Sequence, residues 1–506
     1  MPVVKKTSVS PNPLHSGNVD QYTLGRATYN SIEVPTSGSA TNSAFVAQYS
    51  PTGRLYWVAR VEAVSVVVPI SNGSDANGNV YVPVTWASGN GLLYNANGSL
   101  AATISTTLSG VVKYNKFGIY QWFLSTSNLT YGAITFAPNG DFVLFGSYTS
   151  ATLTVLNLAG TTFKTLVKVG GTTNTAVIRY NSAGAVQWVA QTSPTTNMSS
   201  FQLTTDASGN VYCVGGFTGT LTLFNANETL GATLVSGGSG SGFLVKYTSA
   251  GAVTWALKTD SANNPINAVS TDLVGNVYIT GAGQDTILYN TGGSVFRTLT
   301  STPSASVQGY VAKYTPAGVG AYVVQARSSS GNSGGDPTSL TTDAVGNAYW
   351  GVRVFLVNNF LTFVNDDGST VAGPTNASYY WATAKISSTG SVSWVNNVFV
   401  NSAVGNLPNS TAINSTLGIY QAGQVQSGTS TFTNVGLAVG ATLGGTNNTG
   451  GTLARYDANG LVVWAARQNQ AGGNMGSSSV SVAVDSITIV GTYVGTIGGT
   501  IYSAGL

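Results

Sequence analysis

A ten-residue frame recurs seven times along this 506-residue chain. The frame starts with Lys, Arg or Gln followed by Tyr or Ile, and it continues to a Gly and then to an aromatic residue at constant spacing. Successive frame aromatics lie 65, 66, 67, 67, 72 and 70 residues apart. Self-similarity at a nearly fixed period predicts one supersecondary unit per repeat. The frame aromatics are Trp57, Trp122, Trp188, Trp255, Tyr322, Trp394 and Trp464.

A second frame alternates with the first and reads Asp-x-x-Gly-Asn-x-Tyr. Clear copies begin at Asp75, Asp206 and Asp272, with Asn347-Ala348-Tyr349 ending a fourth. In both frames apolar residues flank a short turn, and Gly supplies the positive φ that such turns need, which is typical of β-hairpins. Degenerate copies lie at 138–142, 414–420 and 485–489, so each frame occurs seven times.

The two frames together predict the fold. Two hairpins per repeat give four strands, which is one blade of a β-propeller. The segment 243–247 is largely apolar on both faces, as a strand packed between two other sheets must be. No segment shows a sustained 3.6-residue apolar period. We therefore predict an all-β, seven-bladed β-propeller with four-stranded blades at residues 21–506, preceded by an N-terminal tail at residues 1–20.

The order of the frames also predicts how the ring closes. The chain begins with the first-frame hairpin at 48–57 and ends with the second-frame hairpin at Asp485. We therefore expect the last blade to take two strands from each end of the chain, which removes free sheet edges.

The paired frames resemble the SBBP repeat of bacterial seven-bladed propellers, in which D-x-x-G-N-x-Y-x-x-G precedes F-x-x-K-x-x-x-x-G-x-x-x-W. Gly215 and Gly281 fit this pattern as well, and the resemblance covers residues 40–506. Proteins with this repeat look like surface, adhesive or scaffold modules, and similar repeats occur in large DNA viruses. The resemblance therefore implies a fold and says little about function.

Two other propeller classes are a poorer match. The Gly-x-x-x-Trp spacing resembles the docking motif of quinone-cofactor dehydrogenases, but the chain has no dedicated acidic cluster for their calcium-bound cofactor. Residues 248–255 are similar to the sialidase turn, but they lack its Asp, and their Gly–Trp spacing is one residue too long.

Composition narrows the function. Only 7% of residues are charged while 42% are hydrophobic, so the surface must be mostly hydroxyl, amide and glycine, which is typical of an extracellular or particle-surface protein. The net charge of +3 comes without a basic run, which argues against nucleic acid. We expect no membrane span, because no apolar stretch is long enough, and no secretory signal peptide is visible after Met1.

Candidate catalytic groups are scarce. His15 is the sole histidine and lies in the tail, and only three Glu are present. The pair Asp366-Asp367 favours a turn over a calcium site, because the spaced acidic ladder of a calcium loop is missing. Cys213 is the only cysteine and is expected to be a small buried side chain. We therefore predict no enzyme activity, no cofactor and no metal site.

The repeat-wide residues have a structural and a functional interpretation. The frame cations could form an anion-binding ring, and the frame tryptophans could stack on sugars. Recurrence at one site favours structure instead, with each cation paired to a recurring Asp or a backbone carbonyl and each aromatic packed between blades. Aromatics outside the frames are better candidates for an exposed contact patch: Trp350, Phe355, Phe360 and Trp381.

These observations favour a non-enzymatic structural or adhesive propeller with protein partners in a larger assembly. A surface-type composition without a visible export signal fits a virion component of a large DNA virus, with loops such as 436–450 making the contacts. The alternative is a glycan-binding, lectin-like adhesin that uses loop aromatics and amides. We expect the protein on a virion or an extracellular surface.

Overall fold

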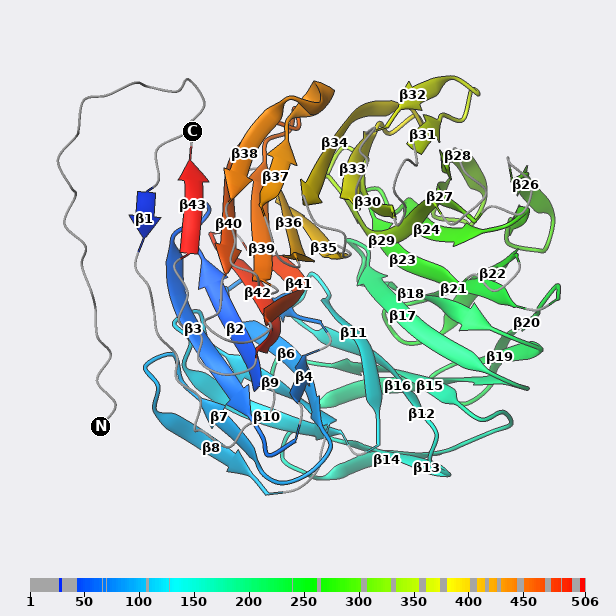
Figure 1. Ribbon diagram of the computed structural model, residues 1–506. Helices are drawn as coiled ribbons and strands as arrows, with labels where there is room; N and C mark the ends of the chain where they lie inside the picture. The colour runs from blue at the N-terminus through cyan, green and yellow to red at the C-terminus, as the bar shows by residue number, and fades with distance from the viewer. Residues whose placement is uncertain are drawn as a thin grey trace.

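The computed structural model describes most of the chain after residue 42. The described residues are 27–29, 43–65, 67–69, 71–105, 109–126, 128–238, 240–261, 265–301, 307–328, 334–354, 361–373, 380–400, 407–414, 418–425, 429–443, 450–468, 475–483, 485–493 and 501–505. Strands dominate this part of the chain, and the sheets follow one another around a central axis in sequence order (Figure 1).

Every copy of the first frame forms an antiparallel hairpin, as its turn chemistry predicts. The frame glycine adopts positive φ at the turn, for example +83° at Gly251. The pairs are β2 (Ser43–Tyr49) with β3 (Leu55–Glu62), β9 (Ser109–Tyr114) with β10 (Tyr120–Thr126), β15 (Asn174–Tyr180) with β16 (Val186–Pro194), β21 (Ser241–Tyr247) with β22 (Val253–Asp260), β27 (Gln308–Tyr314) with β28 (Gly320–Ser328), β33 (Tyr380–Ile386) with β34 (Val392–Val400), and β39 (Gly450–Tyr456) with β40 (Val462–Gln468).

The second frame also forms hairpins, including its degenerate copies. They are β4 (Val67–Pro69) and β5 (Gly73–Ser74) with β6 (Val80–Trp86), β11 (Thr130–Phe136) with β12 (Phe142–Tyr148), β17 (Met198–Thr205) with β18 (Val211–Phe217), β23 (Ile266–Thr271) with β24 (Val277–Gly283), β29 (Gly334–Thr342) with β30 (Ala348–Val354), β35 (Leu407–Asn414) with β36 (Gly418–Val425), and β41 (Met475–Val482) with β42 (Ile487–Tyr493). A second-frame hairpin and the first-frame hairpin beside it form one repeat unit, named below by its frame aromatic.

The expectation of seven separate four-stranded blades is wrong. The described strands form six large sheets and one two-stranded sheet, so the propeller has six blades when a blade is one continuous hydrogen-bonded sheet. The large sheets are built on antiparallel four-stranded cores. Two repeat units share a 12-stranded sheet, because β27 also pairs in parallel with β29 at Gln308 and Gly334. Such a joint involves backbone atoms only, so the side-chain pattern does not reveal it.

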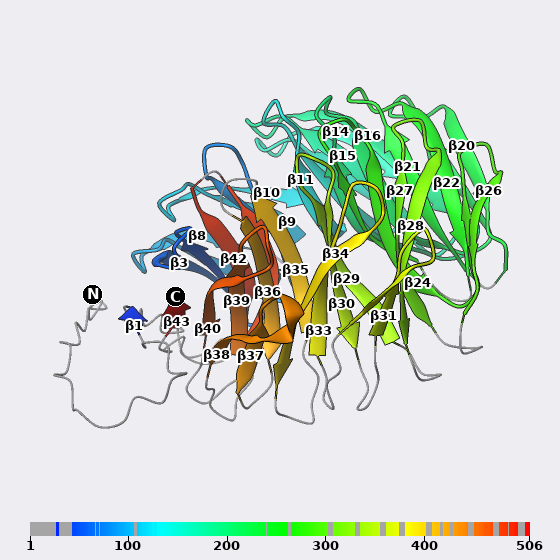
Figure 2. The same ribbon diagram turned by 90° about the horizontal axis from the view of Figure 1, so that it is seen from above.

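The two ends of the chain meet in one sheet. Strand β42 pairs along its whole length with β2, from Tyr493 opposite Ser43 to Ile487 opposite Tyr49. The C-terminal strands therefore lie beside the N-terminal strands (Figure 1, Figure 2). A second link forms next to it, where β43 (Ile501–Gly505) joins β40 to β1 (Ala27–Tyr29). Backbone hydrogen bonds thus close the ring without a covalent bond.

Segments inserted between the two hairpins of a unit form outer hairpins, and residues 436–443 of the expected contact loop 436–450 belong to one of them. Each is inserted in one repeat unit, and most pair with the last core strand of the preceding unit. The hairpin β13–β14 is the two-stranded sheet. The outer strands are β7 (Gly91–Tyr94), β8 (Leu100–Ile104), β13 (Thr152–Leu156), β14 (Thr162–Val167), β19 (Thr220–Phe224), β20 (Leu230–Val235), β25 (Thr286–Tyr289), β26 (Val295–Leu299), β31 (Leu361–Val364), β32 (Thr370–Ala372), β37 (Ser430–Thr433) and β38 (Val439–Leu443), with the short 3-10 helix η1 (Val435–Leu437) in the last turn.

An asparagine anchors the turn of each outer hairpin to the unit in which it is inserted. Asn225 accepts a hydrogen bond at Oδ1 from the backbone N of Val253, at 2.7 Å, and its Nδ2 donates to Thr229. This third frame was not recognised in the sequence, although Asn recurs at the start of each turn. The equivalent acceptors are Asn95, Asn157, Asn290, Asn365 and Asn434.

The apolar core lies between neighbouring sheets. Strand β21 is buried along its whole length, as its two apolar faces predict. One cluster joins both ends of the chain, because Phe45 and Ile487 pack together with Tyr420 and Trp464 of the adjoining unit. Burial of both sheet faces explains why so few charges suffice for this chain.

Loss of the outer-hairpin anchor should destabilise the propeller. We expect Asn225→Ala to lower the free energy of unfolding by about 1–2 kcal/mol, because the N–H of Val253 loses its acceptor. Urea-induced unfolding followed by tryptophan fluorescence measures this. The matched control is Asn227→Ala two residues away, because Asn227 accepts only from Thr229 within the same turn. Equal losses in the two variants would contradict the anchoring role.

Candidate functional site

The turns of both frames gather on one side of the propeller. In an antiparallel sheet the turn between the first two strands and the turn between the last two lie at the same end. We call this side the turn face. Its described turns are 50–54, 115–119, 181–185, 248–252, 315–319, 387–391 and 457–461 from the first frame, and 75–79, 137–141, 206–210, 272–276 and 343–347 from the second.

An aspartate holds each regular second-frame turn, buried at Asp75, Asp206 and Asp272 and half-buried at Asp343. Oδ1 of Asp206 accepts from the backbone N of Ser208 at 2.9 Å and of Asn210 at 3.0 Å. Oδ2 accepts from Nδ2 of Asn210 at 2.8 Å and from the hydroxyl of Tyr212 at 3.0 Å. The Asp, Asn and Tyr of the frame thus form one hydrogen-bonded group that fixes the turn. The same group forms at Asp75, Asp272 and Asp343.

The tyrosines of these groups are held in the neutral form. Burial raises the pKa of Tyr212 well above its ordinary value, and the carboxylate of Asp206 raises it further. The pKa values of Tyr81 and Tyr349 are raised for the same two reasons. A neutral phenol can donate its proton to the Asp, so the turn stays closed at ordinary pH.

The first frame joins each unit to the next through one backbone carbonyl. The carbonyl of Pro316 accepts from Nε1 of Trp255 at 3.0 Å and from Nζ of Lys246 at 3.3 Å. We call this arrangement the shared-carbonyl contact. It recurs at Ser249, which accepts from Trp188 and Arg179, at Ala458, which accepts from Trp394 and Lys385, and at Pro51, which accepts from Trp464 and Arg455.

The structural interpretation of the frame cations and tryptophans is therefore confirmed for these units. Burial lowers the pKa of Lys246, while nearby Asp206 raises it, and the two charged atoms lie 4.0 Å apart. The main partner is thus the carbonyl of the next unit and not the frame Asp. The frame glycine makes room for the indole, because a Cβ at Gly251 would lie 2.8 Å from Cδ2 of Trp188. Trp122 differs, since it stacks on Phe142 with ring centroids 6.1 Å apart.

The Trp188 unit holds one of the three degenerate copies of the second frame. In the Trp188 unit, Ala137 stands at the position of the turn Asp, and Asp141 stands at the position of the Asn. Val143 replaces the Tyr, and Arg179 replaces the usual Lys. The Asp carboxylate and the Tyr hydroxyl that fix the regular turns are therefore both missing here, so other side chains must hold this turn.

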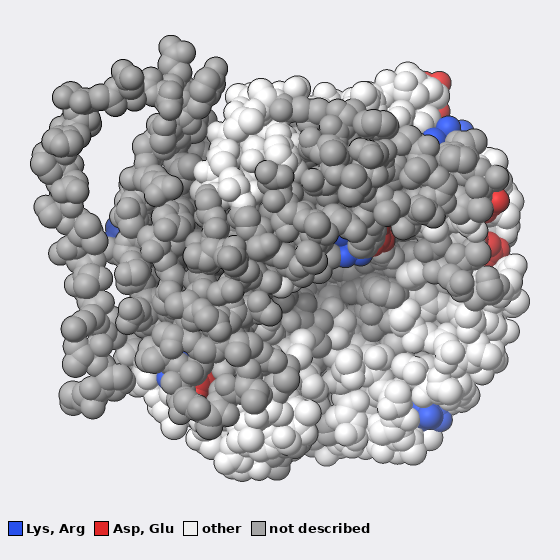
Figure 3. All heavy atoms as spheres, in the orientation of Figure 1, with Lys and Arg blue, Asp and Glu red and all other residues white. Residues whose placement is uncertain are grey.

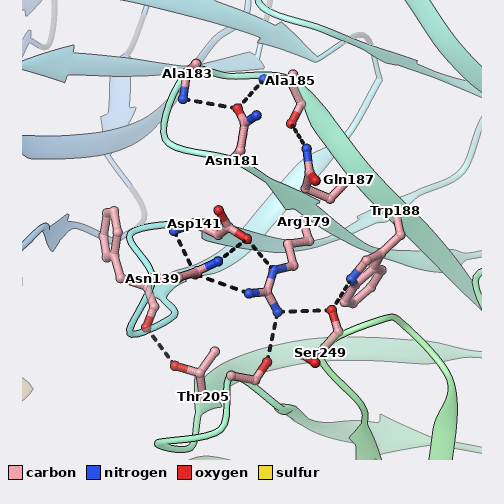
Figure 4. Close-up of polar contacts among 12 residues, drawn as sticks. Asn139, Asp141, Arg179, Asn181, Ala183, Ala185, Gln187, Trp188, Thr205 and Ser249 are labelled. Carbon is pink, nitrogen blue, oxygen red and sulfur yellow. Dashed lines mark hydrogen bonds and ion pairs between the residues drawn. The ribbon is translucent and has the colours of Figure 1, made fainter.

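Arg179 holds this turn and also contacts the next unit (Figure 4). Its Nε donates to Oδ2 of Asp141 at 2.9 Å, and its Nη2 donates to Oδ1 of Asn139 at 3.3 Å. Its Nη1 donates to the carbonyls of Gly209 at 2.9 Å and Ser249 at 3.2 Å, both in the next unit. The guanidinium is nearly buried and carries four acceptors, so it links two units as a rigid group.

A cleft of about 570 Å³ opens beside this group on the turn face. Its size suits a small ligand or a side chain of a partner. It lies at the unit that lacks the Asp and Tyr of the regular second frame. It is lined by Pro138, Asn139, Asp141, Arg179, Gln187, Trp188, Ala207, Ser208, Gly209, Ser249 and Ala250.

The cleft offers hydrogen bonds and a neutral ion pair. The carboxylate of Asp141 uses Oδ2 for Arg179 and Asn139, which leaves Oδ1 to accept from a ligand. The amide of Gln187 lies exposed on the cleft wall. The lining holds two serines but no histidine, lysine or cysteine that could activate them. This set of groups is suited to binding polar ligands.

The predicted contact patch is not exposed where the structure describes it. Trp350 and Trp381 are buried, with exposed fractions of 0% and 1%. Trp350 packs against Phe363 with ring centroids 5.8 Å apart, and both side chains belong to one buried apolar cluster. The expectation of exposure is therefore wrong for these two residues. Phe355 and Phe360 lie outside the described residues, as does the tail at residues 1–20.

The remaining candidate residues have structural surroundings. Asp366 accepts from Arg297 at 2.7 Å and from the backbone of Val323, and residues 365–369 form a turn. Cys213 is buried and unpaired. Among the described residues, no group of three His, Cys, Asp or Glu side chains could hold a metal ion. No described helix is long and apolar enough to cross a membrane.

Several apolar side chains are exposed on the turn face. Val274 and Val345 are 75% and 74% exposed. They occupy the same position in neighbouring second-frame turns, which are linked because the hydroxyl of Tyr278 donates to the carbonyl of Gly346 at 2.8 Å. Among the described residues, few charged side chains are visible on the side of the molecule drawn in Figure 3. Further exposed apolar residues of the turn face are Phe117, Ile119, Leu273, Val319 and Leu461.

The sequence held a signal for the Arg179 site that was not used. The degenerate second frame at 138–142 and the change from Lys to Arg at Arg179 were both visible. The two changes belong to one unit and compensate each other. A comparison of the frames position by position shows that the two changes occur in the same unit.

Comparison with known proteins found a relative that is similar in sequence over part of the chain. No protein-family model matches this sequence, so the SBBP repeat type stays a prediction. The chain is 30% identical over 165 residues to an uncharacterized WD repeat-containing protein, L264, of Acanthamoeba polyphaga mimivirus. The match covers 30% of this chain and only 12% of the length of that protein.

Three solved structures with some similarity are 12% identical to this chain or less. BamB from Moraxella catarrhalis has a TM-score of 0.31 at 12% identity, covering 85% of this chain and 99% of that one. The Dos1 propeller has a TM-score of 0.38 at 8% identity, covering 85% and 93%. Virginiamycin B lyase from Staphylococcus aureus has a TM-score of 0.30 at 8% identity, covering 88% and 99%. Similarity at this level supports no conclusion about activity. The observed sheets themselves show that the chain is an all-β propeller.

Substitution of Arg179 should reveal its coupling to Asp141. We expect Arg179→Lys to lower the free energy of unfolding by about 1–3 kcal/mol, because Lys cannot keep all four acceptors. Adding Asp141→Asn restores the Asn and Lys of the regular units and should cost less than the sum of the two single changes. Urea unfolding of the four proteins of this cycle measures the coupling. Strictly additive losses would show that the two side chains act independently.

Stability should fall in alkali. The unfolded chain releases tyrosine protons near pH 10.0, whereas burial raises the pKa of Tyr212 and Tyr278 in the folded chain. The folded state therefore holds more protons above that pH, and its stability decreases as pH rises. The lowered pKa of Lys246 acts in the opposite direction only below its ordinary value of 10.5. We expect tyrosinate absorbance to rise together with unfolding, and early ionisation of most tyrosines in the folded protein would contradict this.

Proposed function

We propose that this chain is a non-enzymatic interaction propeller that binds protein partners through its turn face. The observation that carries this proposal is the set of apolar side chains exposed on turns that are themselves fixed by buried hydrogen bonds. Val274 and Val345 show this most clearly, because each lies two residues after the Asp that fixes its turn. Contiguous exposed apolar groups mark interaction sites, and a rigid surface loses little entropy on binding.

The chemistry of the Arg179 cleft supports binding in preference to catalysis. A general base or nucleophile needs a free group within reach of the substrate. In this cleft the guanidinium of Arg179 is engaged by four acceptors, and the carboxylate of Asp141 is one of them. The cleft therefore fits a polar side chain of a partner that docks on the turn face.

The proposed setting is a virion of a large DNA virus. The similarity to a mimivirus protein supports this setting, although the match spans a small part of that protein. A charged content of only 7% supports a place inside a protein assembly, where a surface contacts other proteins on several sides.

A lectin-like role is the second candidate, and one observation favours it. Sugars are bound by planar polar side chains that donate and accept in pairs, next to an aromatic ring. The Arg179 cleft presents Asp141, Asn139 and Gln187 beside Trp188. This candidate needs the cleft alone and makes no use of the apolar residues of the turn face.

Cross-linking of native particles tests the leading proposal. Lys116 is exposed on the turn face beside Phe117. Lys168 directly follows strand β14 of the outer hairpin β13–β14. In particles purified from the organism that encodes this chain, we expect an amine-reactive linker to join Lys116 to another protein. Lys168 of the same molecule serves as the internal reference for accessibility.

Two results would contradict the proposal. The chain could be missing from the purified particles, or Lys116 could react as freely there as in the isolated propeller. Binding of the isolated chain to a glycan array, abolished by Asp141→Ala and kept by Val274→Ser, would favour the lectin-like role instead.

A further inference from the structure

The outermost strands of several sheets have an unpaired edge. Strands β8, β20 and β38 each stand last in the strand order of their sheets. One side of their backbone therefore has no strand partner within the described part of the chain. An exposed strand edge is a template for pairing with another strand.

These three edge strands share one sequence pattern. They read Leu-Ala-Ala-Thr-Ile, Leu-Gly-Ala-Thr-Leu-Val and Val-Gly-Ala-Thr-Leu. The first residue of each is exposed, by 52% at Leu100, 63% at Leu230 and 64% at Val439. A Thr three residues later is exposed in each strand as well. Each edge thus offers an apolar and a hydroxyl side chain to the outside.

The usual protection of a free edge is missing from these strands. Proteins commonly block such edges with Lys, Pro or inward-pointing charges. None of the three strands contains a charged residue or a proline. Two other outer strands do carry a basic residue, but both are neutralised, since Lys164 pairs with Glu228 at 2.6 Å and Arg297 pairs with Asp366 at 2.7 Å.

We propose that the outer edges pair with the same edges of a second copy of this chain. The partner is a second copy because every copy presents both halves of the contact. When β20 pairs antiparallel with itself across a two-fold axis, Leu230 lies opposite Val235 of the other copy, and both residues are exposed in the single chain. No like charges meet across this contact.

Several equivalent edges make the contact repeatable. Because β8, β20 and β38 belong to different sheets, one propeller can engage more than one neighbour through its rim. The product is an array of propellers whose turn faces stay accessible. This inference goes beyond the proposed function, since it concerns the rim and does not depend on a partner at the turn face.

Sedimentation velocity of the full chain over a range of concentrations tests the inference. We expect the protein to associate, and we expect Leu100→Lys, Leu230→Lys and Val439→Lys together to weaken association at least about tenfold, because each Lys would place an unpaired ammonium against an apolar residue of the facing strand. The matched control is Val274→Lys, Val319→Lys and Val345→Lys, which adds the same charge at exposed apolar sites of the turn face and should associate like the unchanged protein.

Hydrogen exchange gives a second readout that needs no variant. Amide protons of β20 should exchange more slowly in the associated protein than in the dilute monomer, because new backbone hydrogen bonds protect them. A chain that stays monomeric at every concentration would overturn the inference. So would equal loss of association in the edge and turn-face variants, or unchanged exchange in β20 on association. Failure here leaves a turn-face cross-link at Lys116 unaffected, so the two proposals are tested separately.

Discussion

The propeller depends on a hydrogen bond that each unit receives from its neighbour. An indole N–H and a cation donate to one turn carbonyl of the next unit, as Trp255 and Lys246 do at Pro316. The carbonyl has two lone pairs, so it can satisfy a buried indole and a buried ammonium together. The same kind of hydrogen bond joins Trp464, near the C-terminal end of the chain, to the carbonyl of Pro51, near the N-terminal end. Burying the cation is therefore tolerable in the units that form this contact, and the same contact between Trp464 and Pro51 helps to close the ring.

The same network explains why the turn face is suited to binding. Its turns are fixed from within by Asp and Tyr side chains, so the exposed residues between them are free to vary. Val274 and Val345 form an exposed apolar surface, and a cleft lies beside Arg179 in the unit with the altered second frame. Variation in one unit does not disturb the others, because each unit is joined to its neighbours by its own set of bonds.

Much of the fold could be predicted from the sequence because its key contacts are local. The spacing of Lys, Gly and Trp in one frame reports a hairpin turn, and the order of frames reports the closure between β42 and β2. The number of separate blades was predicted wrongly, since the joint between β27 and β29 is a backbone contact without a side-chain signature. The burial of Trp350 depends on its contact with Phe363 of an inserted outer hairpin, and the anchoring by Asn225 depends on an insertion that pairs with a preceding unit. The recurring Asn marks the outer turns in the sequence, but it does not show which strands these hairpins contact.

The most direct measurement of the central claim is a cryo-electron microscopy map of the native assembly that contains this chain. The account predicts a ring whose turn face, including Val274 and Val345, lies against a different protein. Density for partner side chains in the cleft beside Arg179 would show how that contact is made specific. A ring whose turn face points into solvent throughout the assembly would contradict the account, as would the recovery of the chain solely as a free monomer.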